Sequence, residues 1–150
     1  MAEFIYSPSK CRTMQTSEAV QKHVQAIRDS PKMSALKDSL MGFCGTVDYH
    51  RDANGFGVLY TDGVSYMAEK AGAGWLVSDL GIVSQHKFSR IGFQLWVLRV
   101  PVGGRNAELT MREDTNAPIL YRQYYDWTDF PSGTFVMYLR DGVLMLPSEY

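Results

Sequence analysis

The apolar residues change their spacing near residue 90, and this change constrains the fold more than any other feature of the sequence. Before that point they recur at three- and four-residue steps, as in Met33, Leu36 and Leu40. After it they alternate with other residues, as in Phe93 and Leu95. The first spacing predicts amphipathic helices and the second predicts strands. The sequence therefore predicts an α+β protein.

Two helices are predicted in the first third of the chain. The first begins at Thr16 or Ser17, because a hydroxyl side chain accepts a hydrogen bond from an amide of the first helical turn. It ends at Ser30, since helical geometry is disfavoured in the residue before a proline. Pro31 is well suited to begin a second helix, capped by Ser30, whose apolar stripe runs on to Phe43.

A central helix is predicted from Val64 to about Leu80, with Asp62 as its N-cap. A short strand at residues 56–60 turns through Asp62 and a glycine into this helix. The glycines in residues 72–74 fall inside it, and each costs about 1 kcal/mol of helix stability relative to alanine. We therefore expect another part of the chain to pack closely there.

The remaining segments are predicted to form strands. Residues 46–51 pair with the strand at 56–60 across Asn54-Gly55, a sequence that favours a tight hairpin turn. Five further antiparallel strands follow residue 90, and the last two join at Asp141-Gly142. We expect a mostly antiparallel β-meander sheet with the N-terminal helices and the central helix packed on one face. The five strands are predicted at residues 93–98, 108–112, 119–125, 134–139 and 143–146.

Composition and charge exclude several classes of protein. With 150 residues the chain is predicted to form a single domain, 1–150, and its net charge of -1 lacks the positive excess of a non-specific nucleic-acid binder. Two cysteines, Cys11 and Cys44, are too few for a disulfide framework and predict reduced thiols. The sequence has no basic and apolar leader pattern and no run of ~18 apolar residues. We expect a cytoplasmic protein.

Three motifs stand out in the sequence: Leu59-Tyr60-Thr61-Asp62-Gly63-Val64, Ala71-Gly72-Ala73 with Trp75-Leu76, and Leu146-Pro147-Ser148-Glu149-Tyr150. Through these motifs the sequence resembles an uncharacterised family of small bacterial, plasmid and phage proteins, a domain of unknown function. The resemblance covers about residues 34–150 and leaves 1–33 as an N-terminal extension; Gly74 departs from it, because an aromatic residue is expected there. It implies an accessory gene of a mobile element and assigns no catalytic residue.

A polar cluster is predicted where the two short strands meet the start of the central helix. A histidine beside carboxylates can act as a general base, which makes Asp48, His50 and Glu69 candidate catalytic residues. The structural interpretation is that Asp62 caps the helix and the others lie on solvated surfaces. We favour it, because perturbed environments and not residue types mark a site. The whole cluster is Asp48, His50, Arg51, Tyr60, Asp62 and Glu69.

No motif predicts a metal or a cofactor. The histidines at 23, 50 and 86 are isolated, and no glycine-rich loop follows a strand and opens a helix with a lysine after it. Cys44 with His50 would form a nucleophile and base, but an apolar stripe ends at Cys44 and predicts a buried, inert thiol.

Aromatic residues are dense between 121 and 130. Tyrosine, tryptophan and arginine dominate protein interfaces, because they offer a large rigid area with a polar group. We expect about half of these aromatics to fill the core and the rest to form an interface. Arg99, Arg112, Arg122 and Arg140 are predicted to face solvent on adjacent strands. The candidate interface residues are Tyr121, Arg122, Tyr124, Tyr125, Trp127 and Phe130.

Three functions remain open from the sequence. The first is a non-enzymatic protein-interaction module from a phage, plasmid or bacterial accessory locus, acting as a counter-defence inhibitor that binds a host protein. The second is a small enzyme that uses Asp48, His50 and Glu69. The third is a single-stranded nucleic-acid binder that uses Tyr121, Arg122 and Tyr124 as a stacking surface. We favour the first.

Overall fold

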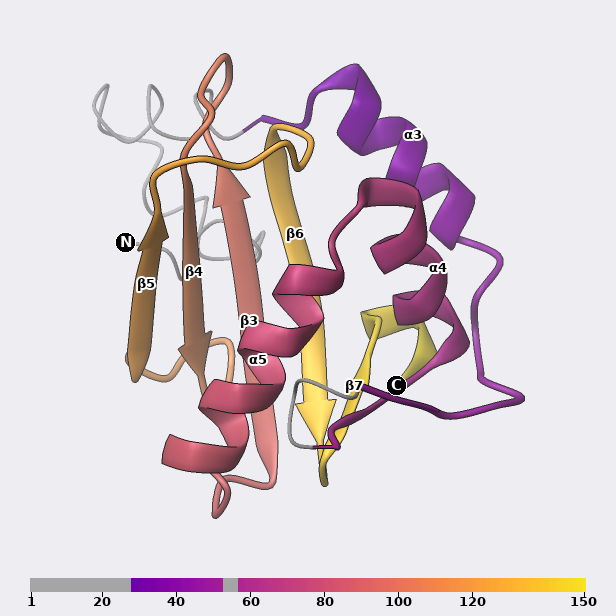
Figure 1. Cartoon of the computed structure of the whole chain (residues 1–150), viewed down its shortest axis with the longest axis vertical. Coiled ribbons are helices and arrows are strands. Elements are labelled where there is room, and N and C mark those ends of the chain that lie inside the picture. The colour runs from indigo at the N-terminus through magenta and orange to yellow at the C-terminus, as the bar shows by residue number, and fades with distance from the viewer. Residues whose placement is uncertain (1–27, 53–56) are drawn as a thin grey trace. The chain divides into compact units, whose positions relative to one another are not determined.

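The computed structural model describes residues 28–52 and 57–150, which form three α-helices and a seven-stranded, mostly antiparallel sheet (Figure 1). The predicted α+β class is confirmed. The predicted first helix and the turn at Asn54-Gly55 fall largely or wholly outside the described residues. The helices are α3 (Pro31–Leu40), α4 (Asp62–Ala71) and α5 (Gly74–Lys87), followed near residue 148 by the short 3₁₀ helix η2 (Pro147–Glu149).

The strands lie in the order β1-β2-β7-β6-β3-β4-β5. β3, β4 and β5 are consecutive and antiparallel, as in a meander, but β6 does not lie beside β5. β2 and β7 pair in parallel, and β1 pairs with β2 in antiparallel fashion. The strands are β1 (His50–Arg51), β2 (Leu59–Tyr60), β3 (Phe93–Val100), β4 (Ala107–Arg112), β5 (Tyr121–Tyr125), β6 (Gly133–Arg140) and β7 (Val143–Met145).

The chain divides into two compact units, which are described separately below. Of the described residues, one unit comprises 28–34 and 95–136, and the other comprises 35–52, 57–94 and 137–150. No helix in the described part of the chain combines the length and the apolar character needed to cross a membrane.

Helix α3 begins as predicted. The Ser30 hydroxyl accepts a hydrogen bond from the Met33 amide at 3.1 Å, and Pro31 is the first helical residue. The stripe ends earlier than predicted, because the helix stops at Leu40. Phe43 lies beyond it, half-buried, with its ring 5.4 Å from that of Tyr66.

The predicted central helix is two helices. Gly72 ends α4 in the left-handed conformation, with φ of 62°, and α5 begins at Gly74. A left-handed residue interrupts the hydrogen-bond ladder, and glycine adopts it without steric cost. The glycine pair that the sequence places inside one helix is therefore a break. α5 then runs to Lys87, beyond Leu80, where the central helix was predicted to end.

Thr61 caps α4, and not Asp62 as predicted. Its hydroxyl accepts from the Val64 amide at 3.4 Å and donates to Glu149 Oε1 at 2.6 Å. Glu149 Oε2 accepts from the Gly63 amide at 3.1 Å. A carboxylate is favoured at a helix N-terminus, where amides lack partners within the helix. The C-terminal segment therefore completes the first turn of α4.

Strands β3 and β4 are buried on both faces, although their alternation predicts half-buried strands. Polar Gln94, Arg99, Thr110 and Arg112 are all buried, together with apolar neighbours such as Trp96.

The β6–β7 hairpin is as predicted. Its turn residues Asp141 and Gly142 both have positive φ, 51° and 82°, which suits a tight two-residue turn.

We expect Gly63→Ala to destabilise the protein by about 1–3 kcal/mol, in the range of overpacking substitutions. A Cβ at residue 63 would lie 2.6 Å from both Glu149 Oε1 and Leu146 Cδ1, so the carboxylate would have to leave the helix terminus. Gly74→Ala is the matched control, because a Cβ there meets nothing within 4 Å. Urea denaturation of both variants measures the difference. Equal stabilities would contradict the role of Glu149.

Candidate functional site

The structure brings His50 of β1 to Asp62, the first residue of α4. His50 Nε2 lies 2.9 Å from Asp62 Oδ1, and the His50 ring stacks on the Tyr60 ring at 5.4 Å. The side chains of the other two candidate catalytic residues, Asp48 and Glu69, are exposed. Within the described residues neither side chain makes a hydrogen bond or ion pair. The contacts therefore join His50 to Asp62.

Asp62 holds the backbone of the segment that precedes β1. Its Oδ2 accepts from the amides of Val47 at 2.9 Å and Asp48 at 3.3 Å. Thr46 completes the arrangement: its hydroxyl accepts from the Asp62 amide at 3.0 Å and donates to the Asp48 carbonyl at 2.6 Å. We call this set of contacts, made by Thr46, Val47, Asp48, His50 and Asp62, the Asp62 clamp.

The Asp62 clamp lowers the pKa of the Asp62 carboxyl from 3.8 to about 2. The largest cause is the hydrogen bond with His50, followed by those from the amides of Val47 and Asp48. Donors directed at a carboxylate stabilise its charged form. Asp62 is therefore ionised over the whole physiological pH range and accepts hydrogen bonds.

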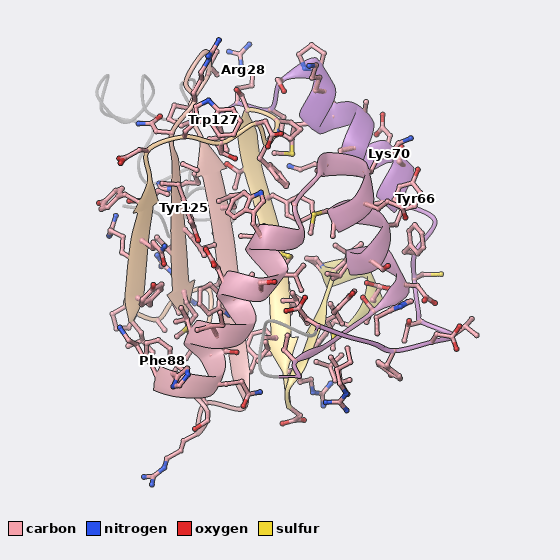
Figure 2. All side chains as sticks on the ribbon, in the orientation of Figure 1. Arg28, Tyr66, Lys70, Phe88, Tyr125 and Trp127 are labelled. Carbon is pink, nitrogen blue, oxygen red and sulfur yellow. The ribbon has the colours of Figure 1, made fainter. Side chains whose placement is uncertain are left out.

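The clamp fixes a loop that exposes apolar side chains. Val47 is 90% exposed and Tyr49 is 61% exposed, although the backbone between them is tied to Asp62. The loop is also held at Phe43, whose carbonyl accepts from the Ser148 hydroxyl at 2.6 Å. Figure 2 shows Tyr66 projecting from α4 toward this segment. Residues 41–49 form what we call the display loop.

The display loop also corrects one prediction. Cys44 lies in it and is exposed, whereas the apolar stripe predicts a buried thiol. The physical reason is that α3 ends at Leu40, so the helical period no longer applies to residue 44.

The arginines of the sheet do not share the solvent-exposed surface that their strand positions suggest. Arg99 and Arg112 are buried, and Arg122 and Arg140 are exposed. Glu108 of β4 bridges two of them: Arg99 Nη2 pairs with its Oε1 and Arg122 Nη1 pairs with its Oε2. Charged groups are buried when they are paired, and a shared carboxylate satisfies this condition.

The predicted aromatic interface is exposed only in part. Tyr124 of β5 is 68% exposed and Trp127, in the loop after β5, is 63% exposed. Arg122 of β5 is exposed as well. Figure 2 labels Trp127 and the half-buried Tyr125. Tyr121 is half-buried as well, with its ring 6.0 Å from that of Trp96.

Phe130 does not offer an exposed surface. It is buried, and its ring lies 5.5 Å from that of Phe135. Its place in the core follows from the turn before it, where the Phe130 amide donates to the Thr128 hydroxyl at 3.0 Å. Aromatic density alone does not distinguish such a core residue from Trp127.

Sequence reasoning missed the display loop. Val47 and Tyr49 alternate with Asp48, a pattern that predicts a strand with one buried face. The signal that could have identified them is Thr46, because a hydroxyl between glycine and an apolar residue favours a turn that binds its own backbone. The partner of that turn, Asp62, lies 16 residues away from Thr46 and no local pattern predicts it.

Comparison with known proteins identifies a family that the chain matches, and it assigns no activity. A family model described as "Family of unknown function (DUF6876)" matches residues 34–150. This agrees with the boundaries of the resemblance described above, and the mobile-element origin stays a prediction. No curated protein and no solved structure matches the chain. Among residues 28–52 and 57–150, no group of three or more histidine, cysteine or acidic side chains could hold a metal.

We expect Asp62→Asn to lower stability at neutral pH and to make stability less dependent on pH in acid. The Asp62 pKa is lower in the folded chain, so its contribution is fully present above the ordinary value of 3.8 and is lost as the pH falls toward about 2. The difference in unfolding free energy between wild type and variant therefore shrinks over this interval. Denaturation between pH 2 and 6 measures it.

Asp48→Asn serves as the control, because the Asp48 side chain is exposed and makes no hydrogen bond with the described residues. If Asp62→Asn and Asp48→Asn gave parallel curves, the Asp62 clamp would not contribute to stability.

Proposed function

We propose that this chain, which belongs to DUF6876, a family of unknown function, is a non-enzymatic protein-interaction module. One observation carries the proposal: the display loop exposes Val47 and Tyr49 on a backbone that the Asp62 clamp holds in place. Loops on a rigid scaffold are the usual position of binding residues.

The exposure of these side chains does not favour folding. An apolar side chain left in water forgoes about 1.5–3 kcal/mol that burial would contribute. A clamped backbone, however, reduces the entropy lost when a partner orders the loop. A fixed loop with exposed Val47 and Tyr49 is therefore suited to insertion into an apolar pocket of another protein.

The finer part of the proposal concerns the partner. The resemblance to accessory proteins of phages and plasmids favours a host protein as the target, with the module acting as a counter-defence inhibitor. Tyrosine is common among residues that dominate binding energy, which makes Tyr49 the expected central contact. Asp48 lies beside it, exposed, and suits a basic or amide group at the edge of the pocket.

A second candidate function is catalysis by His50, which would use its contact with Asp62. A histidine hydrogen-bonded to a carboxylate, as His50 is to Asp62 at 2.9 Å, is the arrangement of a general base and the residue that orients it. The two amides that also donate to Asp62 favour a structural role for the pair. An activity abolished by His50→Gln but retained in Val47→Ser would support the enzyme instead.

The nucleic-acid alternative receives less support from the structure. Two of the arginines that would contact phosphates, Arg99 and Arg112, are buried. A third, Arg122, pairs with Glu108.

We expect Val47→Ser and Tyr49→Ser to weaken partner binding without changing stability, and Tyr49→Ser to weaken it at least tenfold, as for a residue at the centre of an interface. A photo-crosslinking residue at position 49 captures the partner in cells, and titration with that partner measures the affinity. Val102→Ser is the matched control, because Val102 is also exposed and lies in the other unit. Equal affinities for Val47→Ser and Val102→Ser would refute the display loop as the contact surface.

A further inference from the structure

We infer that the partner of the display loop contacts the loop's backbone directly at Gly42 and Gly45. Met41 then enters the same apolar pocket as the two side chains assigned to it above. This inference rests on the proposed function, because it concerns the same loop. It also names the partner by its chemistry, as a protein whose apolar pocket carries hydrogen-bond acceptors at its rim.

The conformation of the loop does not require glycine at either position. Neither Gly42 nor Gly45 has a positive φ, and an added Cβ would meet nothing within 4 Å at either residue. By contrast, Gly72 has a φ of 62°, and a Cβ at Gly63 would lie 2.6 Å from Glu149 Oε1. Glycine without such a reason costs stability relative to alanine, because it loses more conformational freedom on folding.

The backbone around the two glycines is open to another molecule. Gly42, Cys44 and Gly45 are all exposed. In the part of the chain that the structure describes, the amides of Cys44 and Gly45 donate no hydrogen bond. A residue without a side chain lets another chain come close to its peptide groups. An acceptor oxygen of the partner, either a backbone carbonyl or a carboxamide, can therefore reach these amides directly.

Met41 adds a third apolar side chain to the surface. It is 76% exposed, and its amide donates to the Asp38 carbonyl at 3.3 Å, which ties its backbone to the end of α3. Methionine fits irregular apolar pockets, because its side chain is flexible and its sulfur is polarisable. Val47 and Tyr49 are exposed at the other end of the loop, so apolar side chains flank the glycine backbone on both sides.

Phe43 fixes the middle of the loop to its own unit. Its ring lies 5.4 Å from that of Tyr66, and its carbonyl accepts from the Ser148 hydroxyl at 2.6 Å. The glycine before it and the glycine after it are exposed. This contact reduces the entropy lost when a partner binds the glycine backbone.

Alanine substitutions test the inference without a partner. Gly42→Ala and Gly45→Ala should leave the urea midpoint unchanged or raise it, because alanine lowers the entropy of the unfolded chain and its Cβ meets nothing. A lower midpoint in either variant would show that the fold itself requires glycine, and would overturn the inference. Gly74→Ala is the matched control, because residue 74 begins α5, outside the loop, and a Cβ there also meets nothing within 4 Å.

Affinity tests the close approach, with the protein captured by a photo-crosslinking residue at position 49 as the probe. Gly45→Ala should weaken binding by about tenfold, as an extra methyl group in a packed contact does, and Gly45→Leu should weaken it further. Gly74→Ala should leave the affinity unchanged. Equal losses for alanine and leucine would indicate that the loop needs flexibility at residue 45, and would overturn the close approach.

The two proposals can fail separately. If Tyr49→Ser weakens binding and Gly45→Ala does not, this inference is overturned and the proposed function stands. If position 49 captures no protein, or only a second copy of this chain, both are overturned. A photo-crosslinking residue at position 41 should capture the same protein as one at position 49, and failure to do so would remove Met41 from the contact surface.

Discussion

Two carboxylates lie at the N-terminus of α4, and their contacts hold together distant segments of the unit formed by residues 35–94 and 137–150. Glu149 accepts from the Gly63 amide, the Thr61 hydroxyl and, at 3.0 Å, the amide of Leu146. Asp62 turns outward and binds the backbone of the display loop. The helix terminus, which attracts negative charge, thus binds the C-terminal segment through Glu149, whereas Asp62 ties the display loop to the first residue of α4.

Sequence patterns predicted the elements that local chemistry determines. The Ser30-Pro31 start of α3 and the Asp141-Gly142 turn are examples, because each needs only its neighbours. The patterns failed where a group distant in the sequence determines which contact a residue makes. Asp62 has the chemistry of a cap, but Thr61 takes that role with Glu149, and Asp62 is drawn to Val47 and Asp48. A glycine at 72 is tolerated in a helix and equally suits a helix end, so spacing alone did not reveal the break.

The same limit applies to the candidate sites. The sequence indicated that aromatic residues gather near β5, and the structure separates exposed Tyr124 and Trp127 from buried Phe130. It indicated arginines on adjacent strands, but the carboxylate that accepts two of them, Glu108, becomes evident only from the strand register. Exposure and pairing depend on tertiary packing, which residue types do not encode one at a time.

The contacts of Glu149 have a consequence for the way the chain folds. Thr61 and Glu149 are 88 residues apart in sequence, so a helix that begins with a local turn is completed by a segment from a distant part of the chain. Contacts of such separation require a large loop to close before they contribute, which slows folding. We therefore expect the first turn of α4 to become protected from hydrogen exchange late, together with β2 and β7, and the display loop to order only after it.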